Sequence, residues 1–488
     1  MKKRFVENLA FFFALNLLIK PIYVFGIDRV VQNTVGTLTY GSYFPLFNLV
    51  LIFQIFLDLG IENYSRKEIA HNPGLSHRLL SGLLGMKILL SLLFILVFST
   101  AGFFVLPSLH EWQLFVVIII NQTLASFILF LRANMGGLQL FKSESIISVV
   151  DRFAMILICG SLLLIPVTKN QFRIEWFVYA QFAAYLLSLS LSLLIVLHKS
   201  RKISLSIKWK HYIPLLRQLS PYALLLLLMS VYYRIDSVFL RYLLPDGREQ
   251  AGIYAQSFRI VDFLANYALI FSLILLPTFS KLLREREEIS SLLKTALLIL
   301  LVPAASMLIA LIFYRYPLFQ FLYPGSPSES ADIFMILTLS FIGMCISYTF
   351  GALLTANGNL KELIVMAFVA VGISLTLNIL LVPLLKATGA AIANASAQLF
   401  AIVYHIVVVK KKFILKTDWS LLIRANIFIV FALVFAYLIL HSNLEWIPGI
   451  ILTVVSILIL SLFSQLIKIS QLVSFILTYL PRKDLSTS

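Results

Sequence analysis

Charged residues are scarce in this sequence, because Asp, Glu, Lys and Arg together make up only 12% of its 488 residues. Soluble domains carry roughly 25%, and a soluble fold could not cover apolar side chains that make up 60% of a chain. Lipid is therefore the expected solvent for much of the surface. Cysteine is also rare: the two, Cys159 and Cys345, lie within apolar runs. They indicate neither a disulfide framework nor a metal site.

Long polar segments are missing as well. The longest loop, at about 198–217, is too short for a soluble catalytic domain. A membrane enzyme such as a glycan polymerase or lipid-linked glycosyltransferase usually needs a substantial loop that carries acid and base residues, and no such constellation stands out. The sequence has no nucleotide-binding motif, so ATP hydrolysis is not expected. We therefore expect a transporter rather than an enzyme, with no cofactor and no metal ion.

Apolar runs fill most of the chain, and each approaches the roughly 20 residues that a helix needs to cross a bilayer. Helices are the default because lipid offers no partner to an unpaired backbone amide. We predict an all-α polytopic membrane protein with about fourteen transmembrane helices. The predicted spans are about 5–26, 40–63, 79–102, 112–133, 146–166, 174–197, 218–240, 251–279, 291–314, 331–356, 362–384, 387–409, 421–440 and 447–467.

The formal charge of +17 does not indicate a nucleic-acid partner, because the basic residues cluster in short loops. Of the 39 Lys and Arg residues, 27 fall on one set of loops and termini and 7 on the other. The positive-inside rule then places both termini in the cytoplasm. The basic start at 1–4 resembles the beginning of a signal peptide, but we interpret the first run as a retained helix. Residues 468–480 fit either an interfacial helix or a simple helical tail.

Short motifs recur at matching positions of two halves. Ile27-Asp28 before Gly41-Ser42-Tyr43 is echoed by Ile235-Asp236 before Gly252-Ile253-Tyr254. Ala133-Asn134 is echoed by Ala356-Asn357. Two parallel repeats of six helices explain both echoes. The predicted organisation is an N-terminal bundle at 1–200, a basic cytoplasmic linker at 201–217, a C-terminal bundle at 218–410, and two further helices with a cytoplasmic tail at 411–488.

Several stretches resemble polysaccharide-biosynthesis flippases, which export O-antigen and capsule repeat units and belong to the multidrug/oligosaccharidyl-lipid/polysaccharide superfamily. The similar stretches are Gly26-Ile27-Asp28, Thr39-Tyr40-Gly41-Ser42-Tyr43, Leu57-Asp58-Leu59-Gly60-Ile61-Glu62, Arg66-Lys67-Glu68-Ile69-Ala70, Asn357-Gly358-Asn359-Leu360-Lys361, Val382-Pro383 and Thr388-Gly389-Ala390-Ala391. The resemblance implies two six-helix bundles around a central cavity in the bacterial inner membrane. It also implies a substrate made of an oligosaccharide on undecaprenyl diphosphate.

Basic residues inside the predicted spans are the candidates for binding that diphosphate. They are Lys20, Lys87, Arg152, Arg234 and Arg259. A Lys or Arg at the bilayer centre costs about 2.5–3.5 kcal/mol, so it usually faces a cavity or a partner. Lys20 precedes Pro21, where a helix tends to kink. By repeat position, the helices of Arg234 and Arg259 match the first two helices. We expect Lys20, Arg234 and Arg259 to hold the diphosphate, with Lys87 as a further cavity residue.

Structural pairing is the alternative for these charges. Arg259 and Asp262 are three residues apart and could satisfy each other, whereas Arg234 and Asp236 are two apart and badly placed for it. Arg152 could be only interfacial. Three carboxylates in the spans could pair with bases or carry a coupling proton: Asp58, Asp236 and Asp262.

The predicted function is translocation of undecaprenyl-diphosphate-linked oligosaccharide repeat units from the cytoplasmic to the outer membrane face by alternating access. Lipid II flippases are close relatives that usually carry an Arg-Asp pair where this chain has Asp28-Arg29, so they stay an alternative. Multidrug and toxin extrusion exporters are another, although cationic drugs call for acidic rather than basic cavities. A membrane-embedded glycan polymerase is the remaining alternative. Expected partners are the lipid-linked oligosaccharide, membrane lipids and a polysaccharide polymerase machinery.

Overall fold

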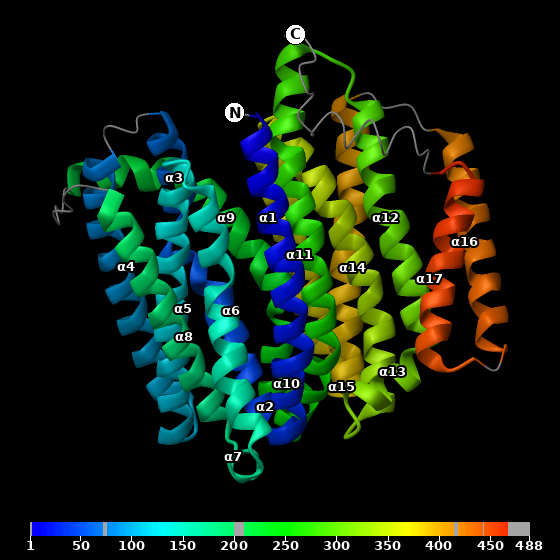
Figure 1. Cartoon of the computed structure of the whole chain (residues 1–488), viewed down its shortest axis with the longest axis horizontal. Helices are drawn as coiled ribbons and strands as arrows, with labels where there is room; N and C mark the ends of the chain where they lie inside the picture. The colour runs from blue at the N-terminus through cyan, green and yellow to red at the C-terminus, as the bar shows by residue number, and fades with distance from the viewer. Residues whose placement is uncertain (1, 72–75, 200–208, 414–417, 443, 467–488) are drawn as a thin grey trace, which may run out of the picture. The chain divides into compact units, whose positions relative to one another are not determined.

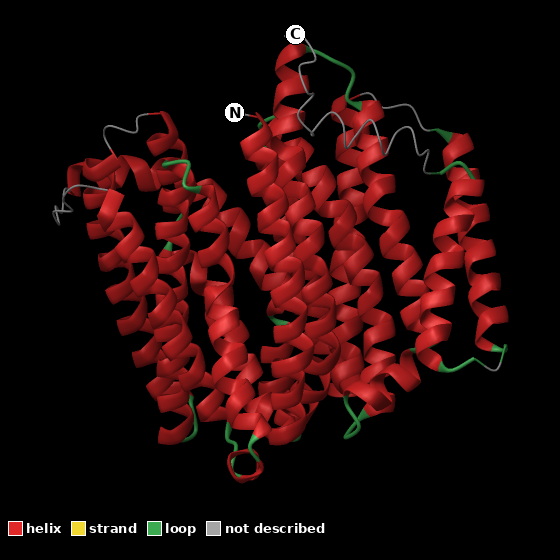
Figure 2. Ribbon diagram, viewed as in Figure 1, coloured by secondary structure: helices red, strands yellow, loops and turns green. Residues whose placement is uncertain are grey.

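The structure is a computed structural model that describes residues 2–71, 76–199, 209–413, 418–442 and 444–466. Every regular element within these ranges is helical (Figure 2). The elements, labelled in Figure 1, are α1 Lys2–Pro21, η1 Ile22–Asp28, α2 Arg29–Phe53, η2 Gln54–Leu57, α3 Ile61–His71, α4 Ser76–Val105, α5 Leu109–Gly137, α6 Phe141–Leu164, α7 Pro166–Asn170, α8 Ile174–Lys199, α9 Trp209–Arg234, α10 Asp236–Leu243, α11 Gly247–Glu285, α12 Ser290–Phe313, α13 Arg315–Leu322, α14 Pro327–Ala356, α15 Leu360–Phe413, α16 Trp419–Leu440 and α17 Trp446–Phe463.

The prediction of an all-α membrane fold is confirmed. Among the described residues, twelve helical segments are long and apolar enough to cross a membrane. Two of them are far longer than one span needs: Phe11–Leu57 has 47 residues and Leu360–Phe413 has 54. Each covers two of the predicted spans. The predicted number of fourteen is not reached for this reason, and it stays a prediction.

Both long segments depart from helical geometry at one interior residue. Gly36 in α2 has φ 78° and ψ 165°, and Lys386 in α15 has φ 53° and ψ −132°. Gly36 suits its position because glycine reaches positive φ without steric cost. Each break leaves roughly 20 or more helical residues on either side, which is enough for a bilayer crossing.

The chain forms two compact units, which we describe separately. The first comprises 1–242 with 246–252, and the second comprises 243–245 with 253–488. Helices α9 and α10 thus belong to the first unit, and the part of the predicted linker from Trp209 onward is helical. Residues 201–208 of that linker and the predicted tail at 468–480 lie outside the described residues. The predicted bundle boundaries stay predictions.

The first unit packs around large buried side chains on several helices. Its core includes Met86, Phe130, Ile147 and Tyr185. Helix α1 ends at Pro21 and continues directly as a π-helix, Ile22–Asp28. Proline has no N–H to donate, and a wider turn accommodates the missing bond. The first helix therefore changes its pitch immediately after Lys20.

In the second unit, α16 and α17 pack on α12 through narrow stripes. Helix α17 buries Gly449, Thr453, Ile457 and Ser461, which recur every four residues along one face. Small residues at this spacing let helix backbones approach closely in lipid. Most of the other apolar side chains of both helices, apart from the buried Phe428, Ala432 and Ala436 of α16, are exposed, as expected for helices surrounded by lipid. The prediction of two further helices after residue 411 agrees with α16 and α17.

Candidate functional site

Arg234 belongs to a polar network in the first unit. It ends α9, is half-buried, and donates from Nη1 to Oδ1 of Asn48 on α2 at 3.1 Å. Asn48 is buried and donates in turn to the hydroxyl of Ser237 on α10 at 3.0 Å. These bonds fix the guanidinium at the point where three helices meet. Arg234 therefore presents a positioned cation within the membrane-spanning part of the unit.

Lys20 and Arg152 lie on helices that pack together, α1 and α6. The ring centroid of Tyr23, which lies one turn after Lys20, is 4.7 Å from the Arg152 guanidinium carbon. Arg152 also lies 3.7 Å from Asp151, and its side chain is 29% exposed. A cation over an aromatic face is held electrostatically. From the sequence, Arg152 could be only interfacial. Its contact with Tyr23 depends on how two helices pack, so the sequence alone did not predict it.

Lys87 has a different environment from the other predicted cavity residues. Its side chain is completely buried, and its ammonium lies 3.2 Å from Asp58 and 3.8 Å from Glu62. The pairing that sequence analysis considered for Asp58 is thus present in the structure. Lys87 faces two carboxylates here, an arrangement that does not favour a second role as a phosphate ligand.

The remaining predicted residues are divided between the units. Asp236 begins α10 in the first unit and is fully buried, and Asp28, its counterpart in the predicted repeat, is buried too. Asp28 accepts from the hydroxyl of Tyr40 at 3.0 Å. Arg259 and Asp262 lie half-buried on α11 in the second unit. Their grouping with residues of the first unit stays a prediction.

Sequence reasoning missed a buried ion cluster at the other end of the first unit. Glu111 begins α5, where its backbone N–H donates to the cap residue Ser108. Its carboxylate lies 2.5 Å from Arg241 on α10 and 2.7 Å from Arg248 on α11. Arg241 also donates to the carbonyl oxygen of Ser42 at 2.6 Å. The Ser108-x-x-Glu111 capping spacing marked a helix start, but nothing local indicated the two arginines.

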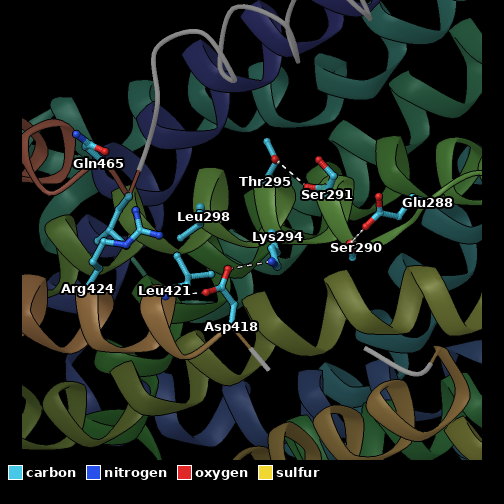
Figure 3. A pocket seen from close by; sticks show the side chains of 11 residues that line it. Glu288, Ser290, Ser291, Lys294, Thr295, Leu298, Asp418, Leu421, Arg424 and Gln465 are labelled. Atoms are coloured by element: carbon cyan, nitrogen blue, oxygen red, sulfur yellow. Dashed lines mark hydrogen bonds and ion pairs between the residues drawn. The ribbon is translucent and has the colours of Figure 1, made fainter. Parts of the chain in front are cut away.

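A small cavity of about 310 Å³ lies in the second unit, where α12 and α16 begin. Figure 3 shows Lys294 directed at Asp418, with the ammonium 2.9 Å from the carboxylate. This contact, together with the N–H of Leu421, holds the pKa of Asp418 below its usual range. Arg424 and Glu288 line the same space. Because its lining carries both signs of charge, the cavity has no clear preference for an anion.

Several solved structures share the fold. A lipid II flippase, MurJ, in an inward closed conformation matches with a TM-score of 0.72 at 15% identity, over 93% of this chain and 98% of that chain. An outward-facing MATE family multidrug resistance transporter of the MOP superfamily matches with 0.58 at 14% identity, over 84% and 97%. A MOP superfamily transporter from Pyrococcus furiosus matches with 0.60 at 13% identity, over 84% and 96%.

These likenesses show that the chain shares its fold with a lipid II flippase and with transporters of the MOP superfamily. Among curated proteins, none matches this sequence. A family model described as polysaccharide biosynthesis protein matches residues 6–283, which is more than half of the chain. The resemblance predicted from the sequence motifs is thereby confirmed, and the chain belongs to the polysaccharide biosynthesis protein family.

Proposed function

We propose that this protein is a flippase for undecaprenyl-diphosphate-linked oligosaccharide repeat units of an O-antigen, capsule or exopolysaccharide. It moves them by alternating access from the cytoplasmic to the outer face of the bacterial inner membrane. The observation that carries the proposal is the positioned Arg234 guanidinium within the spans of a polysaccharide biosynthesis family member. A family role in polysaccharide biosynthesis supports a glycan cargo, and the MOP fold supports transport.

The chemistry of the cation fits the headgroup. A buried Lys or Arg costs free energy in a bilayer and persists where a partner or cargo compensates it. The Arg234 guanidinium is a planar fork of N–H donors, and such forks match phosphate oxygens bidentately. Lys20, at the helix pitch change, is the second proposed phosphate ligand, and Arg152 beside Tyr23 is a third. Arg259 on α11 is proposed for the same cavity.

The energetics favour outward movement of such a cargo. An inside-negative potential assists export of an anion by about 2.3 kcal/mol per net charge per 100 mV. The prenyl chain stays in lipid while the headgroup crosses the cavity. The flippase would then deliver repeat units to a polysaccharide polymerase on the outer face, with both of its own termini in the cytoplasm.

Lipid II is the second candidate cargo, because the MurJ fold covers 93% of this chain. Both cargoes carry a prenyl diphosphate, so the basic residues do not distinguish between them. A flipping assay distinguishes them when proteoliposomes are loaded in parallel with fluorescent lipid II and with a fluorescent lipid-linked repeat unit. Faster flipping of the repeat unit supports our proposal, whereas flipping of lipid II alone contradicts it.

The decisive variant is Arg234→Gln, compared with Arg234→Lys in the same flipping assay. Loss of one charged hydrogen bond, worth about 1.5 kcal/mol, predicts a rate about tenfold lower for Arg234→Gln. Arg234→Lys should retain part of the rate, because it keeps the charge but loses the fork. Lys281→Gln, on the exposed end of α11, is the matched control. Wild-type flipping by Arg234→Gln at normal thermal stability would rule out the assignment of Arg234.

A further inference from the structure

A second cluster of titratable groups lies in the first unit, at the end where α2 and α5 end and α4 and α6 begin. It contains Asp58, in the turn after η2, Glu62 on α3, and Lys87 on α4. We name these three residues the acid–lysine centre. All three belong to the same compact unit, and the helices that carry them pack against one another.

Lys87 has no donor left for Glu62. Its ammonium donates to the Ser126 hydroxyl at 2.8 Å, to Asp58 Oδ1 at 3.2 Å and to the Leu57 carbonyl oxygen at 3.4 Å. An ammonium has three N–H donors, and these bonds use all of them. Glu62 Oε1, at 3.8 Å, therefore feels the charge of Lys87 without a hydrogen bond.

Asp58 is held in place by the local backbone. It accepts from the N–H of Gly60 at 3.0 Å and from the N–H of Glu62 at 3.2 Å. The turn that makes this possible has positive φ at Leu59, 48°, and at Gly60, 90°. The carboxyl group of Asp58 therefore has a fixed position in the turn, beside Glu62.

Glu62 is the remaining carboxylate, and it is placed to exchange a proton. Its side chain is 24% exposed, and the residue follows the membrane-spanning segment that ends at Leu57. No hydrogen bond to its carboxylate oxygens is found within the described part of the chain. The charges that face it are Asp58, Lys87, Arg132 on α5 and Arg66 on its own helix.

Two of those cations, Arg66 and Arg132, also interact with other carboxylates. Arg66 forms a bidentate contact with Glu144 of α6, with distances of 2.6 and 3.3 Å. Arg132 is influenced by Glu144 and Asp151, and its buried Nε has no hydrogen-bond partner among the described residues. Burial first, and then the charge of Asp58, raise the pKa of Glu62 to about 7. Lys87, Arg132 and Arg66 oppose that rise without cancelling it.

We propose that the acid–lysine centre is a proton-binding site in which Glu62 is the group that gains and loses the proton, and that its protonation docks α3 against α4 and α5. The direction follows from linkage. A carboxyl whose pKa is raised in the docked state binds its proton more tightly there than when released. Docking is therefore favoured at acidic pH and weakens as the pH rises through about 7. Neutral Glu62 avoids both its own desolvation and repulsion from Asp58.

The use of this proton in transport rests on the proposed function, whereas proton binding does not. The first experiment therefore needs no cargo. Purified protein in nanodiscs is titrated by infrared difference spectroscopy, which follows the stretch of protonated carboxyl groups. We expect a carboxyl that titrates near neutral pH in the wild type and in Glu68→Gln, a matched change on α3, but not in Glu62→Gln. Persistence of that signal in Glu62→Gln overturns the proposal.

Hydrogen exchange of the 61–71 peptide, corrected for intrinsic rates, tests the docking step. At alkaline pH, Glu62→Gln should protect α3 more than the wild type does, because Gln stays neutral. Equal protection at every pH contradicts a role in docking. Flipping of the lipid-linked repeat unit should then lose its pH dependence in Glu62→Gln. If the wild type flips no cargo, the proposed function is wrong. The infrared titration still shows whether Glu62 binds a proton.

Discussion

At the residue scale, a deeply buried ion pair of the first unit lies away from the predicted ligands. Glu111 accepts a hydrogen bond from Arg241 and forms an ion pair with Arg248, and the Glu111 and Arg241 side chains are only 9% and 4% exposed. Removal of one partner of a buried pair leaves the other charge without compensation, at a cost of about 3–5 kcal/mol. The cluster therefore ties the start of α5 to α10 and to the first turn of α11.

Glu111→Ala should accordingly lower the free energy of unfolding by about 3 kcal/mol, because it leaves Arg241 buried without its anion. Thermal unfolding in detergent measures the change as a lower midpoint. His110→Ala, one residue earlier, is the control. It removes the exposed partner of Glu175 and should change the unfolding midpoint little. Equal changes in the unfolding midpoint for the two substitutions would mean that burial of Glu111 does not increase its contribution to stability.

At the scale of elements, α2 and the start of α11 cross with their backbones in contact. A Cβ at Gly41 would lie 1.7 Å from the Arg248 carbonyl oxygen, and one at Gly252 would lie 2.0 Å from the Thr37 carbonyl oxygen. Neither carbonyl can move away as a flexible side chain would. The crossing therefore requires glycine on both helices.

Gly41→Ala is expected to push the two helices apart and destabilise the first unit by about 1–3 kcal/mol or more. Gly82→Ala on α4 is the control, since no atom lies within 4 Å of a Cβ there. A cysteine pair across the crossing should form a disulfide readily in the Gly82→Ala background and poorly in the Gly41→Ala background. Unchanged cross-linking would show that the crossing tolerates a methyl group.

Sequence patterns predicted the elements well, for a physical reason. Lipid makes apolar runs obligatory, so the spans can be found by composition alone. Site chemistry depended instead on contacts between helices distant in sequence. Lys87 was recognised as an intramembrane cation, but its burial against Glu62 depends on the turn at Leu59 and Gly60. The spacing of Ser108 and Glu111 indicates only the start of a helix, whereas the contact of Glu111 with Arg241 on α10 depends on the fold.

At the scale of the whole molecule, the number of membrane crossings depends on the two long helical segments, Phe11–Leu57 and α15; α15 is the easier to test. Its 54 residues continue past Lys386, where the backbone leaves helical geometry. A helix needs about 20 residues to cross the hydrocarbon core, so α15 can cross twice only if the chain reverses at this residue. Lys386 then lies at the outer surface and Lys411 in the cytoplasm, as the distribution of basic residues predicts.

Lys386→Cys should therefore react with a membrane-impermeant maleimide added to intact cells. Lys411→Cys, the control near the end of the same helix, should react only after permeabilisation. The native Cys159 and Cys345 are buried and give little background. Labelling of Lys386→Cys only after permeabilisation would exclude the reversal and, with it, the predicted fourteen spans.

The two glycines of the α2–α11 crossing are also the two that the predicted repeat would align. A Cβ on Gly41 would meet the backbone nitrogen of Gly252 at 2.7 Å. The two positions therefore share one contact, and a side chain at either position would open it. Glycine at one position cannot compensate for a larger residue at the other.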